Sequence, residues 1–309
     1  YMKRNAGTTY DDRMVQAVAW FQRDHGLATD GVAGAGTLGM INIEPATRLS
    51  QIVVAMERER WLNMPLGKRH IWVNITDFHA RVVDDGKVTF KTRSVVGKNM
   101  KDRRTPEFSD VMEHMVINPT WYVPRSIATK EYLPLLKKNP YAVSNLNLVD
   151  SRGRVISREG IDFTEFDERS FPFDMREPPN QGNALGLVKF MFPNRHNIYL
   201  HDTPAKSLFG REKRDFSHGC IRLNEPFDFA YHLLAKQERD PVGFFKAELG
   251  TGKESYVYLD QPIPVHIVYR TAFTEAKGNV QFRRDVYGRD QKIWQALSDA
   301  GVALRAVRG

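Results

Sequence analysis

The first sixty-four residues carry apolar side chains at helical spacing, interrupted by glycine-rich turns. A first helix is predicted after Asp11 or Asp12, either of which can cap it, and Gly26 is its stop signal. Its apolar positions recur three or four residues apart: Met14, Val15, Val18 and Phe21. A second short helix is expected from Thr37, with Leu38 and Ile41 directed inward.

A third amphipathic helix is predicted from Ala46 to Met64. Its charged residues, from Glu57 to Arg60, are expected to lie away from the apolar stripe. That stripe is expected to consist of Leu49, Ile52, Val53, Met56 and Trp61. The helix is interpreted as a connector between a small helical unit and a larger one.

From His70 onward the apolar positions follow a period of two, which predicts strands. Ile71, Val73 and Ile75 alternate with outward positions, and the turn Asp84-Asp85-Gly86 precedes a returning strand at Val88–Val96. These residues predict a β-meander with one buried face. A strand is also expected at Asn197–Leu200, and a strand pair around Tyr256–Tyr269.

The segment from Val123 to Gly186 breaks this rhythm. Ser126 can cap a helix that ends before Asn139-Pro140, and the rest is charged, aromatic and proline-rich. So long a segment inside a β-rich unit is usually functional, as a lid for example, or else disordered. Later helices are predicted at Pro226–Lys236 and from Asp290 to a stop at Gly301.

Composition narrows the class of protein. The 309 residues suggest two units or one large domain with additions, and 41% hydrophobic residues exclude a wholly disordered chain. No apolar run reaches the ~18 residues that a membrane span needs. The net charge is 45 − 37 = +8, spread along the chain. It fits a partner with carboxylates or phosphates, although a solvated basic surface is the more ordinary explanation.

The single cysteine, Cys220, excludes an intramolecular disulfide and four-cysteine zinc sites. An unperturbed thiol is only about 3% thiolate at pH 7, so a nucleophilic cysteine needs a basic neighbour, and either His201 or His218 could supply one. Gly219 permits a tight turn with backbone N–H groups aimed at an oxyanion, and Arg222 could hold a substrate carboxylate. This spacing suits acyl transfer through a thioester.

Two other readings of these residues stay open on chemistry alone. A solitary cysteine is most often a small buried hydrophobe. His201, Asp202, His218 and Cys220 are also all possible zinc ligands.

The string from His201 to Leu223, HDTPAKSLFGREKRDFSHGCIRL, is similar to the active-site signature of the L,D-transpeptidases with a YkuD-type catalytic domain. Further segments resemble the large Gram-negative, YcbB-like members, which carry a peptidoglycan-binding module and a substrate-capping insertion. They are Ile71–Ile75, Val95–Lys98, Thr105-Pro106, Asn118–Trp121 and Val123-Pro124.

The N-terminal string FQRDHGLATDGVAGAGT resembles the second half of the peptidoglycan-binding module. The helix that usually precedes it is hard to find in Tyr1–Tyr10. The residues that carry the resemblance are Phe21, Gln22, Gly26, Leu27, Asp30, Gly31, Gly34 and Thr37. An ordinary helical hairpin with a tight turn is the alternative.

The resemblance implies a role for each residue of the site. Cys220 is implied as the nucleophile and His201 as its general base and later proton donor, oriented by the backbone carbonyl of Asp202. Many relatives have glycine at that position, which leaves the part of the Asp202 carboxylate open. Other implied residues shape the turn and oxyanion hole (Ser217, His218, Gly219) or line the substrate cleft (Arg222, Trp121, Tyr122).

The implied reaction forms 3→3 peptidoglycan cross-links between donor and acceptor tetrapeptide stems. Water as acceptor would give L,D-carboxypeptidase activity, and carbapenems are implied to acylate Cys220. The resemblance implies no cofactor, no metal and no nucleic acid, other cell-wall synthases as further partners, and a place in the periplasm or cell envelope, with the leader missing before Tyr1. The alternatives are a cell-wall cysteine endopeptidase or amidase, and a non-catalytic peptidoglycan-binding protein.

Together these observations predict an α+β protein: a β-rich catalytic domain, built as a mixed β-sandwich with helices, and a small helical module. The module is assigned to residues 1–45 and a connecting helix to 46–68. The catalytic domain is assigned to 69–270 with an insertion at about 123–186, and a C-terminal extension with a final helix to 271–309.

Overall fold

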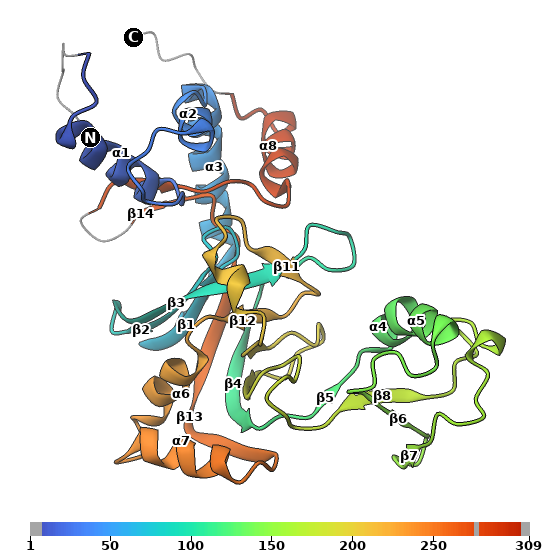
Figure 1. Ribbon diagram of the computed structural model, residues 1–309. Coiled ribbons are helices and arrows are strands. Elements are labelled where there is room, and N and C mark those ends of the chain that lie inside the picture. Colours follow the sequence, from blue (N-terminus) through green and yellow to red (C-terminus); the bar gives the residue numbers. More distant parts are fainter. Residues whose placement is uncertain (1–7, 275–277, 304–309) are drawn as a thin grey trace.

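The computed structural model describes residues 8–274 and 278–303, so the two outer ends of the predicted module and extension lie outside the described residues. At one end of the molecule lie three N-terminal helices, α1 (Asp12–Asp24), α2 (Ala35–Ile41) and α3 (Pro45–Trp61) (Figure 1). The predicted cap of α1 is confirmed, because the Asp11 carboxylate accepts the Met14 N–H at 2.9 Å.

The buried face of α2 differs from the prediction. Leu38 and Ile41 are about half exposed, whereas Thr37 and Met40 are buried. The reason is a polar centre: the buried Gln22 amide donates to the Thr37 hydroxyl at 3.1 Å. The helix also begins at Ala35 rather than at Thr37.

The predicted stripe on α3 is also wrong in part. Met56 and Trp61 are 64% and 59% exposed, and the buried face contains Val54, Ala55 and Arg58 instead. Arg58 forms an ion pair with Asp290 and lies over the Tyr269 ring. A polar residue can be buried here because its partner comes from the far end of the chain, which local periodicity cannot reveal.

Nine strands of the catalytic unit form one sheet in the order β11-β3-β12-β10-β9-β4-β13-β1-β2, and β2 also pairs with β3, so the sheet folds back on itself. This arrangement confirms the predicted β-rich unit in an α+β protein. The two layers of the predicted sandwich belong to one continuous sheet. The strands are β1 (Arg69–Asn74), β2 (His79–Asp84), β3 (Lys87–Gly97), β4 (Phe108–Ile117), β9 (Val188–Met191), β10 (Leu200–His201), β11 (Asp215–Ser217), β12 (Ile221–Leu223) and β13 (Ser255–Val268).

The predicted meander corresponds to β1, β2 and β3, with the Asp84–Gly86 turn between the last two. The predicted strand pair at Tyr256–Tyr269 is wrong, because β13 is a single long strand, antiparallel to β4 and parallel to β1. The pairing of β13 with β4 is irregular between Tyr258 and Ile263, where the sequence resembles a turn. Strands tolerate proline at such irregularities.

Helices α6 (Pro226–Leu234) and α7 (Pro241–Gly250) pack on the sheet and fill its core with Phe229, Leu233 and Phe245. The C-terminal extension contributes a short hairpin, β14 (Ala272–Thr274) and β15 (Val280–Phe282), and the final helix α8 (Arg289–Asp299). Helix α8 starts one residue before the predicted Asp290 and packs against α3.

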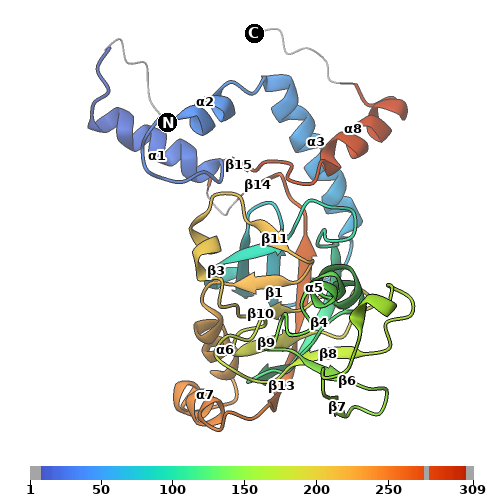
Figure 2. The same cartoon turned by 45° about the vertical axis from the view of Figure 1, so that its right-hand side comes forward.

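The insertion is an ordered subdomain with its own core, which projects sideways from the sheet in Figure 1 and stands in front of it in Figure 2. Its helix starts at Arg125, after Pro124 and not after a Ser126 cap, and passes through a π-helical turn. Its elements are β5 (Trp121–Tyr122), α4 (Arg125–Ile127), η1 (Ala128–Tyr132), α5 (Leu133–Lys138), β6 (Asn147–Val149), β7 (Val155–Ile156), η2 (Phe163–Glu165) and β8 (Asp174–Glu177). We call this unit the capping subdomain.

The four strands of the capping subdomain pair in the order β5-β8-β6-β7. The core of the subdomain contains Leu136, Phe163, Phe171 and Met175, each no more than 2% exposed. Aromatic and aliphatic residues with little periodicity thus pack into a compact unit.

Among the described residues, no helix has the length and the apolar character needed to cross a membrane.

Arg58→Ala is expected to lower the free energy of unfolding by about 3–5 kcal/mol, because it leaves the Asp290 carboxylate buried without its cation. Denaturant unfolding followed by circular dichroism measures this. The matched control is Arg60→Ala on the same helix, whose side chain is 79% exposed and whose loss should cost less than about 0.5 kcal/mol. Equal effects of the two substitutions would contradict the structural role of the buried pair.

Candidate active site

Cys220 lies in a tight turn between β11 and β12, preceded by Gly219 with φ +123°. Only glycine adopts this backbone conformation readily. The Ser217 hydroxyl closes the turn: it accepts the Gly219 N–H at 3.1 Å and donates to the Cys220 carbonyl. Ser217 therefore fixes the backbone on both sides of the thiol-bearing residue.

A buried threonine holds this turn against the end of β3. The Thr105 hydroxyl donates to the Gly219 carbonyl at 2.7 Å and accepts the Gly97 N–H at 2.9 Å. Gly97 has no room for a side chain, because a Cβ there would lie 2.0 Å from the Arg103 carbonyl oxygen. The Tyr287 hydroxyl, from the C-terminal extension, donates to the Gly97 carbonyl.

His201 is buried at the end of β10, beside the turn in the sheet, because β10 pairs with β12. Its Nδ1 lies 2.5 Å from the backbone carbonyl oxygen of Asp202, which can only accept. The neutral ring therefore carries its proton on Nδ1, and Nε2 has the lone pair that a general base needs.

The charge states of His201 and Cys220 follow from the loss of solvent around their side chains. Burial lowers the pKa of His201 to about 3, and the charge of Arg222 acts in the same direction. Burial raises the pKa of Cys220 to about 11, opposed by hydrogen bonding with Tyr199 and by the charge of Arg222. At neutral pH the resting site thus holds a neutral imidazole and a neutral thiol.

The Asp202 carboxylate faces away from this chemistry. It accepts from the Thr203 N–H at 2.7 Å and the Leu187 N–H at 3.0 Å, and it pairs with the Lys206 ammonium at 2.5 Å. Its side chain thus anchors loops, while its backbone carbonyl touches the histidine.

A cavity of about 400 Å³ lies between the sheet and the capping subdomain and brings most of the predicted residues together. The side chains of Tyr122 and Asp202 are not among its lining, and Tyr122 is 62% exposed. Gly219, in the turn itself, is not among the lining residues either. The predicted residues that line it are Cys220, His201, Ser217, His218, Arg222 and Trp121.

Glu131, on the π-helical turn of the capping subdomain, lies at the rim of this cavity. Its Oε1 lies 2.7 Å from the His218 Nε2 and 2.7 Å from the Arg103 Nη2. His218 belongs to the turn that carries Cys220, and Arg103 belongs to the loop that packs on Gly97. One carboxylate therefore joins the capping subdomain to both sides of the site, and we call this set of three residues the clasp.

Sequence reasoning did not identify Tyr199 or Glu131. The Tyr199 ring centroid lies 5.6 Å from that of His201, and burial together with the nearby Cys220 raises the pKa of the Tyr199 hydroxyl. The period of two along a strand could have predicted the place of Tyr199, because a residue two positions before His201 lies on the same face of the strand. Glu131 has no comparable signal, because its partners are 28 and 87 residues distant in sequence.

The proposed zinc set is not assembled. Across residues 8–274 and 278–303, no three His, Cys, Asp or Glu side chains gather closely enough to hold a metal ion. Asp202 points to Lys206, and His218 to Glu131.

Two family models match the chain. One, described as the L,D-transpeptidase catalytic domain, matches residues 68–247, and the other, described as "Putative peptidoglycan binding domain", matches residues 1–41. A curated protein of Haemophilus influenzae, named "Putative L,D-transpeptidase", is 32% identical over 257 residues. That match covers 81% of this chain and 50% of the relative, so the chain spans about half the length of that relative.

Solved structures of L,D-transpeptidases are also similar, at lower levels. One from Stackebrandtia nassauensis is 16% identical, with 90% of this chain and 86% of that chain covered and a TM-score of 0.32. Another, in complex with imipenem, is 14% identical, with 65% and 59% covered and a TM-score of 0.28. These TM-scores are too low to support an argument. The catalytic-domain model, however, covers more than half of the chain and contains both Cys220 and His201, so this chain belongs to the L,D-transpeptidase family.

Proposed function

We propose that this chain forms 3→3 peptidoglycan cross-links through a thioester on Cys220. The observation that carries the proposal is the common cavity: the only thiol of the chain and the buried His201 line it together, beneath a capping subdomain. The family match supports this chemistry. It also supports peptidoglycan stems as substrates. A cell-envelope location is part of the same proposal.

In the first half-reaction the Cys220 sulfur attacks the carbonyl carbon of the L-centre of diaminopimelate in a donor stem. With a thiol pKa of about 11, little thiolate is present at pH 7, so His201 Nε2 must accept the proton as the C–S bond forms. The tetrahedral intermediate then collapses. The C–N bond to D-Ala breaks, and the amine leaves with the proton that His201 returns.

The oxyanion of that intermediate needs backbone donors. The Gly219 N–H is engaged by Ser217 at 3.1 Å, whereas the described residues supply no acceptor for the Cys220 N–H. We therefore assign the Cys220 N–H as an oxyanion donor, a type of contact worth about 3 kcal/mol where it has been removed. Arg222 lines the same cavity and is suited to a stem carboxylate.

In the second half-reaction the side-chain amine of an acceptor stem attacks the thioester, gives a proton to His201, and releases the Cys220 sulfur. Water in place of the amine would give L,D-carboxypeptidase activity. The strained carbonyl of a carbapenem presents the same electrophile to the sulfur, so such compounds are proposed to acylate Cys220.

Intact-mass spectrometry after incubation with a carbapenem is expected to show one adduct on the wild type and none on Cys220→Ala. In parallel, purified tetrapeptide stems are expected to yield dimers with the wild type alone. Fragments without dimers would favour a cell-wall endopeptidase or amidase. An adduct that persists on Cys220→Ala would overturn the assignment of the nucleophile.

His201→Gln is expected to slow carbapenem acylation by roughly 10²–10⁴-fold, because the thiol loses its proton acceptor. His218→Gln is the matched control, since that ring faces Glu131, and is expected to slow acylation by less than about tenfold. Stopped-flow fluorescence measures both rates. The reverse order of the two effects would make His218 the base.

The pH dependence of thiol alkylation tests the resting charge states. With a Cys220 pKa of about 11, the thiolate fraction and the iodoacetamide rate should rise about tenfold per pH unit from 7 to 10. No step is expected near pH 6.5, because His201, with a pKa of about 3, stays neutral throughout. A rate that is level between pH 5 and 9 would instead reveal a preformed thiolate–imidazolium pair.

We further propose that the capping subdomain shields the thioester from water. Its contacts with the site include the clasp, two charge-assisted contacts of 2.7 Å whose side chains are between 26% and 35% exposed. Groups this exposed are partly screened by solvent, so the clasp is worth about 1 kcal/mol of closure. A lid held this weakly can open for stems to enter.

Glu131→Ala is therefore expected to raise the ratio of hydrolysis to cross-linking by roughly fivefold, while leaving carbapenem acylation within about threefold. Mass spectrometry of products from tetrapeptide stems measures the ratio. Glu165→Ala, an exposed carboxylate elsewhere on the capping subdomain, is the matched control. An unchanged ratio in Glu131→Ala would refute the shielding role of the clasp.

A further inference from the structure

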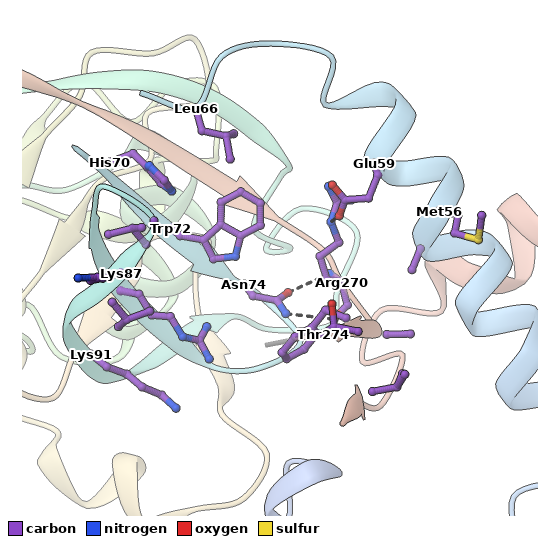
Figure 3. Close-up of a pocket in the computed structure, with 18 of the residues that line it drawn as sticks. Met56, Glu59, Leu66, His70, Trp72, Asn74, Lys87, Lys91, Arg270 and Thr274 are labelled. Atoms are coloured by element: carbon purple, nitrogen blue, oxygen red, sulfur yellow. Dashed lines mark hydrogen bonds and ion pairs between the residues drawn. The ribbon is translucent and has the colours of Figure 1, made fainter. Parts of the chain in front are cut away.

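The outer face of the sheet carries two further surfaces beside the catalytic cavity. The first is the cavity between α3 and β1, where the Asn74 amide donates to the Arg270 carbonyl at 3.0 Å and Arg270 pairs with Glu59 (Figure 3). These polar groups are engaged with one another. The second surface lies over β4, β9 and β13, and its aromatic rings are open to solvent.

Aromatic side chains gather on this second surface. Tyr256 and Tyr258 of β13 are 53% and 65% exposed, because they alternate with the buried Val257 and Leu259. The His114 ring of β4 contacts both of them, with ring centroids 5.8 Å from that of Tyr256 and 5.0 Å from that of Tyr258. We call Tyr256, Tyr258 and His114 the tyrosine strip.

The tyrosine strip is connected to the catalytic cavity across the sheet. Tyr258 is paired with His114 on β4, and His114 is paired with Met191 on β9, so the three side chains lie on one face. The register of β10 with β9 places Tyr199 beside Met191, which is partly exposed. Tyr199 lines the catalytic cavity. One row of side chains therefore leads from the strip to the cavity.

Strand β9 adds a cation to the same face. Lys189 precedes Met191 by two residues and lies opposite His201. Burial lowers the pKa of Lys189, and the charge of Glu254 opposes this effect. The Glu254 carboxylate accepts the Thr120 N–H at 2.8 Å, and no described residue forms an ion pair or hydrogen bond with the Lys189 ammonium. A partly buried ammonium in this state favours a ligand carboxylate.

The strip itself favours an uncharged ligand. Burial lowers the pKa of His114, opposed by the charge of the exposed Glu113, so the ring is neutral at pH 7. A polyanion would meet the Glu113 carboxylate here and no cation of the strip. The strip is also too small for a protein interface, which ordinarily takes about 20–30 residues a side.

We propose that the tyrosine strip binds sugar rings of a peptidoglycan glycan strand, while Lys189 contacts a carboxylate of the stem that runs from those sugars to Cys220. The C–H faces of sugars stack on aromatic rings, and their hydroxyl groups can form hydrogen bonds with tyrosine hydroxyls. This inference rests on the proposed function, because it takes the stem at Cys220 to be the substrate.

The distance from the strip to the cavity matches the length of a stem. Tyr258 and Tyr199 belong to strands that are three strand spacings apart, which is about 14 Å. Three to four extended residues span at most about 10–14 Å. In a tetrapeptide stem that ends in D-Ala, the diaminopimelate is the third residue. A stem whose sugar lies on the strip can therefore bring this residue to Cys220.

The test compares two small probes, a disaccharide–tetrapeptide and the N-acetylated tetrapeptide without sugar. Calorimetry measures their binding to the full chain carrying Cys220→Ala, so that no covalent adduct forms. The probe with sugar is expected to bind roughly tenfold more tightly. Tyr258→Thr removes a ring but keeps a β-branched residue in the strand, and should reduce this advantage to about threefold. The matched control is Tyr141→Thr on the capping subdomain, whose ring is 64% exposed and whose loss should leave the advantage unchanged.

Lys189→Met tests the contact with the stem. It is expected to weaken the binding of both probes about fivefold, because the carboxylate belongs to the stem that they share, and to leave the advantage of the sugar unchanged. Lys189→Arg keeps the charge and should restore binding to within about twofold of the wild type. Equal binding of the N-acetylated tetrapeptide by Lys189→Met and the wild type would overturn the role of Lys189.

An undiminished advantage of the sugar in Tyr258→Thr would overturn the role of the strip, and so would an equal loss in Tyr141→Thr. Thermal unfolding verifies that each variant is folded, and Tyr256→Thr provides the same comparison at the neighbouring ring. Equal weakening of both probes by Tyr258→Thr would place its effect in the catalytic cavity and would also refute the strip.

The same variants separate this proposal from the catalytic one. A wild type that neither reacts with a carbapenem nor cross-links stems, but whose preference for the sugar still depends on Tyr258, would refute the proposed function and leave the strip standing. A wild type that cross-links stems but binds both probes equally would refute the strip and leave the proposed function standing.

Discussion

The site depends above all on the hydrogen bond from the Thr105 hydroxyl to the Gly219 carbonyl. That single side chain ties the turn that carries Cys220 to Gly97 at the end of β3, and Gly97 in turn is held by Tyr287. The turn, in which Gly219 has a φ of +123°, is held in addition by Ser217 from within and by the Lys98 N–H, which donates to the Ser217 carbonyl at 2.8 Å. The position of the sulfur is therefore set by residues from three distant parts of the chain.

Burial explains how such a site can be both stable and reactive. A thiolate on the half-buried Cys220 and an imidazolium on the buried His201 would each lose solvation, so both groups rest uncharged, with pKa values displaced to about 11 and about 3. In the proposed reaction, charge appears only while a proton moves between the Cys220 sulfur and the His201 nitrogen. The capping subdomain covers the cavity from one side, and Trp121, 9% exposed, forms part of both its core and the cavity wall.

Sequence patterns could predict whatever depends on neighbours along the chain. The Asp11 cap, the meander and the grouping of Cys220 with His201 all follow from local signals or from a short signature. Residues whose partners are remote could not be predicted: Arg58 reads as a solvated charge until Asp290 is placed beside it, and Glu131 reads as one of many surface carboxylates. The prediction that Tyr122 lines the cleft is wrong for a related reason. Tyr122 directly follows Trp121 in a strand, so its side chain points to the opposite side.

The hydroxyl of Tyr287 lies forty residues beyond the last residue of the matched catalytic domain, which ends at position 247. The segment that contains Cys220 and His201 is thus shorter than the segment whose residues hold them in position. A chain that ended at this boundary would keep Cys220 and His201, but it would lose strand β13 and the support that Tyr287 gives to the Cys220 turn through Gly97. The C-terminal extension is in this sense an external brace, and proteolytic clipping between β13 and α8 would act on catalysis from a distance.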